Sequence, residues 1–438
     1  MNSQTVLITA AAIADGSGLL TRPGAILLRR GRIVASGTPQ FIGVPAGTAQ
    51  IMRPDSLVIP GLVNAHCHLD LTHIGPIPYP GAFVTWIEAV RTRRADSDQA
   101  VRNSVERGAE LSRAGGTGLI GDIAGARSAV PVDALRATGL SGVSYVEMFG
   151  LGRSQLAAIE WLREIAATCP HDDRGVKLGL QPHSPYSCGL DVFAGAAAIG
   201  LPMATHLAET PEELQFVESA DGPLAEMLAR LGVLDDTVIG HGGHPIDHLA
   251  DVLATTPFLA AHVNYLEPQH VQQLAGWPIS VAYCPRASAY FGHPQHGAPP
   301  HQYLDMLNRG LNVALGTDSI LCLGRADRIS VLDEMRFLHA RDGVDPALLL
   351  RMATVNGARA LGFDPLSVTL APGSSLNSGL IALPIGHSRE TNPVIQILHN
   401  DDAPNWIIDH CGEDETISCG ANRPTACSGA IEHGRFVP

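Results

Sequence analysis

The chain has no excess of positive charge. Its 438 residues include 29 lysines and arginines against 43 aspartates and glutamates, which gives a formal net charge of −14. Nucleic acids and anionic membrane surfaces bind proteins largely through basic side chains. We therefore expect a small-molecule substrate, with neither a nucleic acid nor a membrane as partner.

Long apolar runs and closely paired cysteines are also missing. No stretch approaches the ~20 apolar residues of a transmembrane helix, and residues 1–10 lack the basic start of a signal peptide. The eight cysteines include no CxxC pair, which excludes the usual zinc knuckle or redox dithiol. We expect a cytoplasmic protein with reduced thiols. A disulfide among Cys411, Cys419 and Cys427 stays open.

The two ends of the chain differ from its middle. Residues 1–57 contain short apolar runs separated by glycine or Asp-Gly, which favour strands and turns. After the middle region helical periodicity is lost again, and residues 370–373 and 380–383 are expected to be strands. We predict a small β-sandwich domain built from 1–57 and 366–438, with no prediction for the structure of 400–423.

The middle of the chain, residues 58–365, alternates apolar strands with alanine- and leucine-rich helical stretches. This alternation is typical of a parallel sheet, and eight units predict an α/β fold of the (β/α)8 TIM-like barrel type. The first strand ends at His66. The other seven strands are expected at 118–122, 143–147, 176–181, 202–206, 258–262, 278–283 and 313–318, and helices at 98–114, 154–168 and 211–231.

Metal-binding residue types gather at the C-terminal ends of these strands, where barrel enzymes keep their active sites. His66 and His68 are two residues apart, so in a strand both imidazoles project from one face. Taken alone, this pair would suit two half-buried histidines as well as a metal site. Further strands end in His183, His206, His262 and Asp318, and a buried carboxylate needs a cation or hydrogen bonds.

Seven segments occur in the order found in the amidohydrolase superfamily. They are 60–68 (PGLVNAHCH), 182–187 (PHSPYS), 206–209 (HLAE), 260–262 (AAH), 283–288 (YCPRAS), 316–319 (GTDS) and 353–362 (ATVNGARALG). The chain resembles the branch that holds chlorohydrolases, guanine deaminase, S-adenosylhomocysteine and methylthioadenosine deaminases, and aminodeoxyfutalosine deaminase. This resemblance implies a metal-dependent hydrolase of carbon–nitrogen bonds.

The resemblance also implies roles for individual residues. One divalent ion, Zn²⁺ or else Fe²⁺, would be bound by His66, His68, His206 and Asp318. Glu209 would be the proton shuttle, His262 would orient the water and His183 would contact the substrate, while Trp86 is a candidate for the pocket wall. Glu209 also suits a solvated carboxylate at a helix start, and Trp86 a core aromatic. Lys177 lies too early in its strand to bridge two metals, so we expect a mononuclear site.

The implied reaction is hydrolytic deamination of an aminated purine-type heterocycle, adenine nucleoside-like, such as aminodeoxyfutalosine or S-adenosylhomocysteine. Metal-activated water would attack the ring carbon and ammonia would leave. A triazine-type chlorohydrolase or a ring-opening cyclic amidohydrolase is the alternative, although Glu209 favours loss of ammonia, which needs a proton. The apolar run 320–324 differs from the usual deaminase sequence and leaves the identity of the substrate open. A catalytically inactive barrel scaffold is the third interpretation. Whether the protein forms a homo-oligomer also stays open.

The remaining histidines are assigned to loops. His241 and His244 form an HxxH in glycine-rich surroundings, which we interpret as a structural loop. His293, His296 and His301 are expected in a solvated loop or a lid over the pocket. Cys67, between the paired histidines, should point away from the metal.

Overall fold

The computed structural model describes residues 5–125, 128–169, 175–295, 297–386 and 392–408. The predictions for His296 and for Cys411, Cys419 and Cys427 lie outside these residues. The five described cysteines are buried and unbridged. In the described part of the chain, no helix has the length and apolar character needed to cross a membrane.

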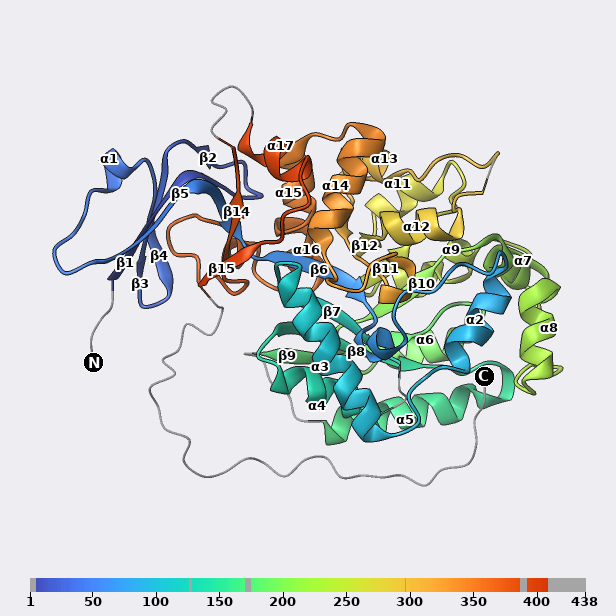
Figure 1. The fold of residues 1–438 in the computed structure, drawn as a ribbon. Helices are drawn as coiled ribbons and strands as arrows, with labels where there is room; N and C mark the ends of the chain where they lie inside the picture. Colours follow the sequence, from blue (N-terminus) through green and yellow to red (C-terminus); the bar gives the residue numbers. More distant parts are fainter. Residues whose placement is uncertain (1–4, 126–127, 170–174, 296, 387–391, 409–438) are drawn as a thin grey trace.

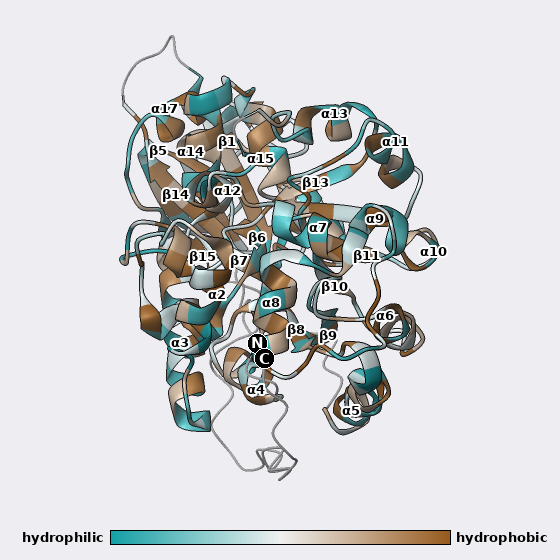
Figure 2. Cartoon of the chain, turned by 90° about the vertical axis from the view of Figure 1, so that its right-hand side faces the viewer, coloured by the Kyte–Doolittle hydropathy of each residue, from teal (hydrophilic) through white to brown (hydrophobic). Residues whose placement is uncertain are grey.

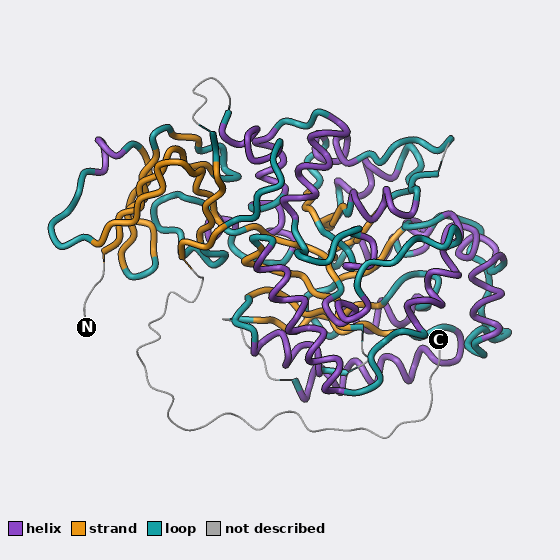
Figure 3. The backbone as a smooth tube through the Cα atoms, viewed as in Figure 1, coloured by secondary structure: helices purple, strands orange, loops and turns teal. Residues whose placement is uncertain are grey.

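Eight parallel strands form the centre of the larger part of the molecule (Figure 3). The first sheet contains β6 (Leu62–Cys67), β7 (Thr117–Ala124), β8 (Ser141–Met148) and β9 (Val176–Pro182), and the second contains β10 (Ala204–Leu207), β11 (Phe258–His262), β12 (Ile279–Tyr283) and β13 (Asn312–Leu315). Parallel bridges join Leu180 to Met203 and Cys67 to Asp318. Both edges of one sheet are thus linked to the edges of the other, and all eight predicted strands are present.

Helices surround these strands (Figure 1). They are α2 (Phe83–Arg91), α3 (Asp98–Ala114), α4 (Val130–Ala137), α5 (Gln155–Thr168), α6 (Leu190–Ala197), α7 (Pro211–Ser219), α8 (Gly222–Arg230), α9 (Pro245–His248), α10 (Ala250–Leu253), α11 (His270–Ala275), α12 (Pro285–Phe291), α13 (Tyr303–Asn308), α14 (Val331–Asp342), α15 (Pro346–Met352), α16 (Val355–Ala360) and α17 (Pro393–Leu398). Short 3₁₀ segments are Leu69–Ile74, Gly152–Ser154, Ile320–Cys322 and Pro365–Val368.

The predicted helix at 98–114 is found over the same residues. Ser97 caps α3 by accepting the N–H of Ala100, and Val101, Val105 and Leu111 face the core at helical spacing. The predicted helix at 211–231 is instead two helices, α7 and α8. Ala220 ends α7 because its φ of 55° is left-handed, and the next helix, α8, begins at Gly222.

Strands from both chain ends share one seven-stranded sheet at the left of Figure 1. It contains β1 (Thr5–Ala14), β2 (Leu20–Thr21), β3 (Gly24–Arg29), β4 (Arg32–Gly37), β5 (Ala49–Pro60), β14 (Leu380–Pro384) and β15 (Asn405–Ile408), and α1 (Pro39–Ile42) lies between β4 and β5. β14 and β15 confirm the return of strand structure, whereas 370–373 is a turn whose Gly373 N–H donates to Ile33. Sandwich packing stays a prediction, since the described strands form one hydrogen-bonded sheet.

The central strands are almost wholly buried, and the helices around them carry both hydrophilic and hydrophobic residues (Figure 2). One apolar cluster joins Val63, Leu119, Tyr145 and Leu259 from four strands to Ala358 of α16. Burial of such side chains contributes about 1.5–3 kcal/mol each for the larger ones. This layer leaves the carboxyl ends of the strands as the place where polar side chains gather.

Candidate metal centre and active site

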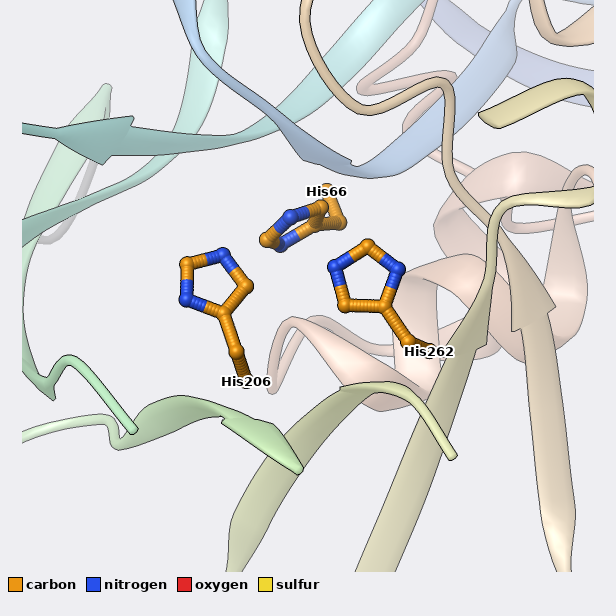
Figure 4. Close-up of side chains that lie close together, drawn as sticks. All are labelled: His66, His206 and His262. Carbon is orange, nitrogen blue, oxygen red and sulfur yellow. The ribbon is translucent and has the colours of Figure 1, made fainter. Parts of the chain in front are cut away.

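Four histidines converge at the carboxyl ends of β6, β10 and β11. The ring centroid of His66 lies 5.1 Å from that of His68, 5.1 Å from that of His206 and 5.4 Å from that of His262. Figure 4 shows His66, His206 and His262 with their rings turned toward one another. His262 therefore lies about as close to His66 as His206 does.

Asp318 completes this group from the segment that follows β13. Its Oδ1 lies 3.4 Å from His68 Nε2, and its backbone N–H donates to the carbonyl of His66 at 3.0 Å. Ligand atoms of His66, His68 and Asp318 all lie within 4.8 Å of one another, and so do those of His66, His206 and His262. The two groups share His66, so the side chains of the four predicted ligands lie around a single candidate metal site.

The protonation and pairing of these groups fit a divalent metal. Both ring nitrogens of His66 and Nδ1 of His68 are buried and have no hydrogen-bond partner among the described residues. Burial lowers the pKa of His66 and His68 well below its usual value and that of His206 to about 3, so the imidazoles keep a free lone pair. Burial also raises the pKa of Asp318 to about 7. A cation would stabilise this carboxylate, and the nitrogen and oxygen donors suit Zn²⁺.

Hydrogen bonds hold the predicted ligands in place. His206 Nδ1 donates to the carbonyl of His183 at 3.1 Å, which leaves Nε2 to face the centre. Asn64 Nδ2 donates to Thr317 Oγ1 at 2.8 Å, and the N–H of Thr317 donates back to Asn64 Oδ1 at 3.1 Å. This reciprocal pair ties the end of β6 to the end of β13, directly beside Asp318.

Glu209 is buried rather than solvated. It follows β10 and precedes Thr210, the N-cap of α7; its Oε1 lies 3.6 Å from His262 Nε2. Glu213 accepts the backbone N–H groups of Ala208 at 2.9 Å and Glu209 at 2.8 Å, which sets the turn. Burial raises the pKa of Glu209 well above its usual value, so this carboxyl can hold a proton near neutral pH.

A cavity of about 510 Å³ opens over these side chains, and both His183 and Trp86 line it. Trp86 also packs on Phe291, with ring centroids 4.9 Å apart, so it is at once a wall of the cavity and part of the core. Lys177 Nζ donates to the Gly362 carbonyl and is not among the residues that line the cavity. Cys67 Sγ points to the Gly121 carbonyl, 3.6 Å away, as expected.

Among the lining residues that were not singled out from the sequence are three that form one ion-paired group: Asp70, Arg94 and Glu147. Asp70 lies two residues beyond His68, and Glu147 lies near the end of a predicted strand, so a search of strand ends could have found both. Arg94 stands on the segment between α2 and α3 and carries no such signal.

The loop histidines behave differently from one another. His244 caps α9, whereas His301 is buried and donates to the carbonyl of His262 at 2.8 Å, so it is not solvated.

Residues 57–399 match the family model described as "Amidohydrolase family". An aminodeoxyfutalosine deaminase of Deinococcus radiodurans is 28% identical over 396 residues, which cover 81% of this chain and 85% of that protein. A 5′-deoxyadenosine deaminase of Methanothermobacter thermautotrophicus is 28% identical over 390 residues, 85% of this chain and 83% of that protein.

Among solved structures, an adenosine deaminase of Xanthomonas campestris with bound zinc has a similar fold. Its TM-score is 0.72 at 19% sequence identity, and the match covers 90% of this chain and 88% of that one. The resemblance drawn from the seven sequence segments is confirmed by the family match over most of the chain. The chain belongs to the amidohydrolase family.

Proposed function

We propose that this protein is a metal-dependent hydrolase that deaminates an adenine-type nucleoside and releases ammonia. The relatives described above support this substrate class. The observation that carries the proposal is the convergence of two donor groups on His66, with the Glu209–His262 pair beside them. His66, His68, His206 and Asp318 would hold one ion, Zn²⁺ in the first place and Fe²⁺ in the second.

When bound, such an ion supplies Lewis acidity that brings the pKa of a water toward ~7. Asp318 accepts the proton of the attacking water, and His262 orients that water by a hydrogen bond. Glu209, whose pKa burial raises well above its usual value, donates a proton to the ring nitrogen next to the reacting carbon. Asp318 then passes the proton that it took from the water to the amino group, which leaves as ammonia, and the proton of the hydroxyl on the ring carbon returns to Glu209 as the carbonyl forms. His183 and Trp86 hold the base in the cavity.

The wider architecture is part of the same proposal. The two four-stranded sheets, bridged at both edges, form the (β/α)8 barrel over residues 58–365. The described residues of 1–57 and 366–438 form a small β-domain, with β5 and β14 as adjacent strands, and residues 409–438 of this predicted domain lie outside the described part of the chain. Reduced thiols are typical of the cytoplasm, which we propose as the location of the protein. We also propose that the site binds one metal ion.

Ammonia release from metal-loaded protein tests the function. The purified protein should contain about one equivalent of metal and release ammonia from at least one of adenosine, 5′-deoxyadenosine, methylthioadenosine and S-adenosylhomocysteine. Glu209→Gln should abolish release while metal content stays unchanged. Chloride release from a chlorotriazine, or ring opening of a cyclic amide, without any deamination would overturn the proposal, as would a metal-free protein inert toward the whole panel.

A further inference from the structure

Arg94 is one of the charged side chains that line the cavity beyond the predicted metal donors. Its Nη1 donates to Asp70 Oδ2 at 2.6 Å and to the carbonyl of Gly125 at 2.9 Å, and its Nη2 lies 3.6 Å from Glu147 Oε2. The Arg94 side chain is 29% exposed, against 3% for Asp70 and 2% for Glu147. The guanidinium therefore faces the cavity, and the two carboxylates hold it from behind.

The backbone makes room for this arrangement at Gly125. A Cβ at that position would lie 2.6 Å from Arg94 Nη1 and 2.9 Å from Glu147 Oε2, closer than side-chain carbons approach. Gly125 follows β7 directly, so the strand end itself provides the space. The absence of a side chain at Gly125 therefore allows the guanidinium of Arg94 to lie beside Glu147 at the end of β7.

The side chains of Glu147 and His183 connect Arg94 to the predicted metal ligand His206. Glu147 Oε1 is 3.8 Å from His183 Nε2, and the His183 ring centroid is 4.9 Å from that of His206. A ligand that places its reacting carbon at the histidine cluster can therefore reach Arg94 with another part of the same molecule. The cavity that contains both is continuous.

The charges around Arg94 decide which chemical group it can accept. One guanidinium and the two carboxylates of Asp70 and Glu147 sum to −1, and Asp96 and Asp98 add negative charge to the lining. An incoming carboxylate would meet this negative field and compete with Asp70 for the guanidinium. In the described part of the chain, Arg94 Nε and Nη2 make no hydrogen bond, so donors remain for an uncharged oxygen.

We propose that Arg94 binds a neutral oxygen acceptor, a hydroxyl or ether of the sugar, and that the site selects neutral nucleosides over those bearing a carboxylate. This inference rests on the proposed function, because it assumes that an adenine-type base occupies the metal end of the cavity. Arg94 is a binding residue here and takes no part in proton transfer.

Calorimetric binding to the zinc-loaded Glu209→Gln variant tests the inference apart from turnover. Adding Arg94→Lys, which keeps the charge but loses the planar fork, should raise the Kd of adenosine about 10-fold, the typical effect of a lost charge-assisted hydrogen bond. The Kd of 9-methyladenine, which has no sugar, should stay unchanged. Arg91→Lys is the matched control, because Arg91 also lines the cavity but pairs with Glu88.

The carboxylate prediction uses adenosine and its 5′-uronic acid. The Kd of the uronate should be at least about 10-fold higher than that of adenosine. Adding Glu147→Gln, which removes one negative charge, should lower the ratio of these two Kd values. Equal loss of affinity for adenosine and 9-methyladenine on Arg94→Lys would show a purely structural role and overturn the inference, as would tighter binding of the uronate. Absence of ammonia release by the wild-type enzyme would instead refute the proposed function, while these affinities would still test Arg94.

Discussion

Replacement of Asp318 by asparagine should separate chemistry from folding at the metal centre. Asp318 has a left-handed φ of 58°. Asparagine adopts this conformation more readily than alanine and most other residues do. Its Oδ1 accepts the N–H of Ser319 at 2.7 Å, and an amide oxygen can accept the same bond. The change from a charged to a neutral acceptor should cost about 1 kcal/mol of unfolding free energy.

The effect on catalysis should be much larger. The amide of asparagine cannot take the proton of the attacking water, and loss of a general base lowers the rate about 10²- to 10⁴-fold, which corresponds to about 3–5 kcal/mol of activation free energy. The assay is ammonia release at saturating zinc, with metal content and urea unfolding measured on the same samples. Asp327→Asn, at an exposed aspartate paired with Arg325, is the control. Near-normal kcat in Asp318→Asn with bound metal would refute the assigned proton transfer.

Three further predictions concern the metal, the hydrogen bonds beside it and the strand packing. Chelation should lower the unfolding free energy, and zinc at 100 times its Kd should restore about 2.7 kcal/mol; unfolding that is indifferent to zinc would contradict the four-ligand site. Asn64→Leu should lower the free energy of unfolding in urea by about 1–3 kcal/mol and should also lower kcat, because both hydrogen bonds between Asn64 and Thr317 are lost and the Thr317 N–H keeps only the His66 carbonyl as acceptor; unchanged stability would show that this pair of hydrogen bonds does not stabilise the site. Gly118→Ala should lower the free energy of unfolding by about 1–3 kcal/mol, because its Cβ would lie 2.0 Å from the Ser378 carbonyl oxygen. Gly243→Ala, where nothing lies within 4 Å of the added Cβ, is the matched control and should leave the stability nearly unchanged.

The interval between His66 and His68 already determined that their side chains share a face, because successive residues of a strand alternate. The alternation of apolar strand segments with helical stretches located eight strands and the polar residues at their carboxyl ends, including His206, His262 and Asp318. The seven family segments identified the family before any geometry was considered. These features are local in the chain, so periodicity and spacing are enough to find them.

Only the tertiary structure decided which distant residues support the site. Asn64 and Thr317 are 253 positions apart, and their mutual hydrogen bonds arise because β6 and the end of β13 become neighbours where the two sheets meet. Arg94 lies on a connection without periodicity, and it becomes a cavity residue because Asp70 and Glu147 from two separate elements bind it there. No spacing rule encodes such contacts. They depend on how the eight strands are brought together, which is also what turns one pair of histidines into a centre with four predicted ligands.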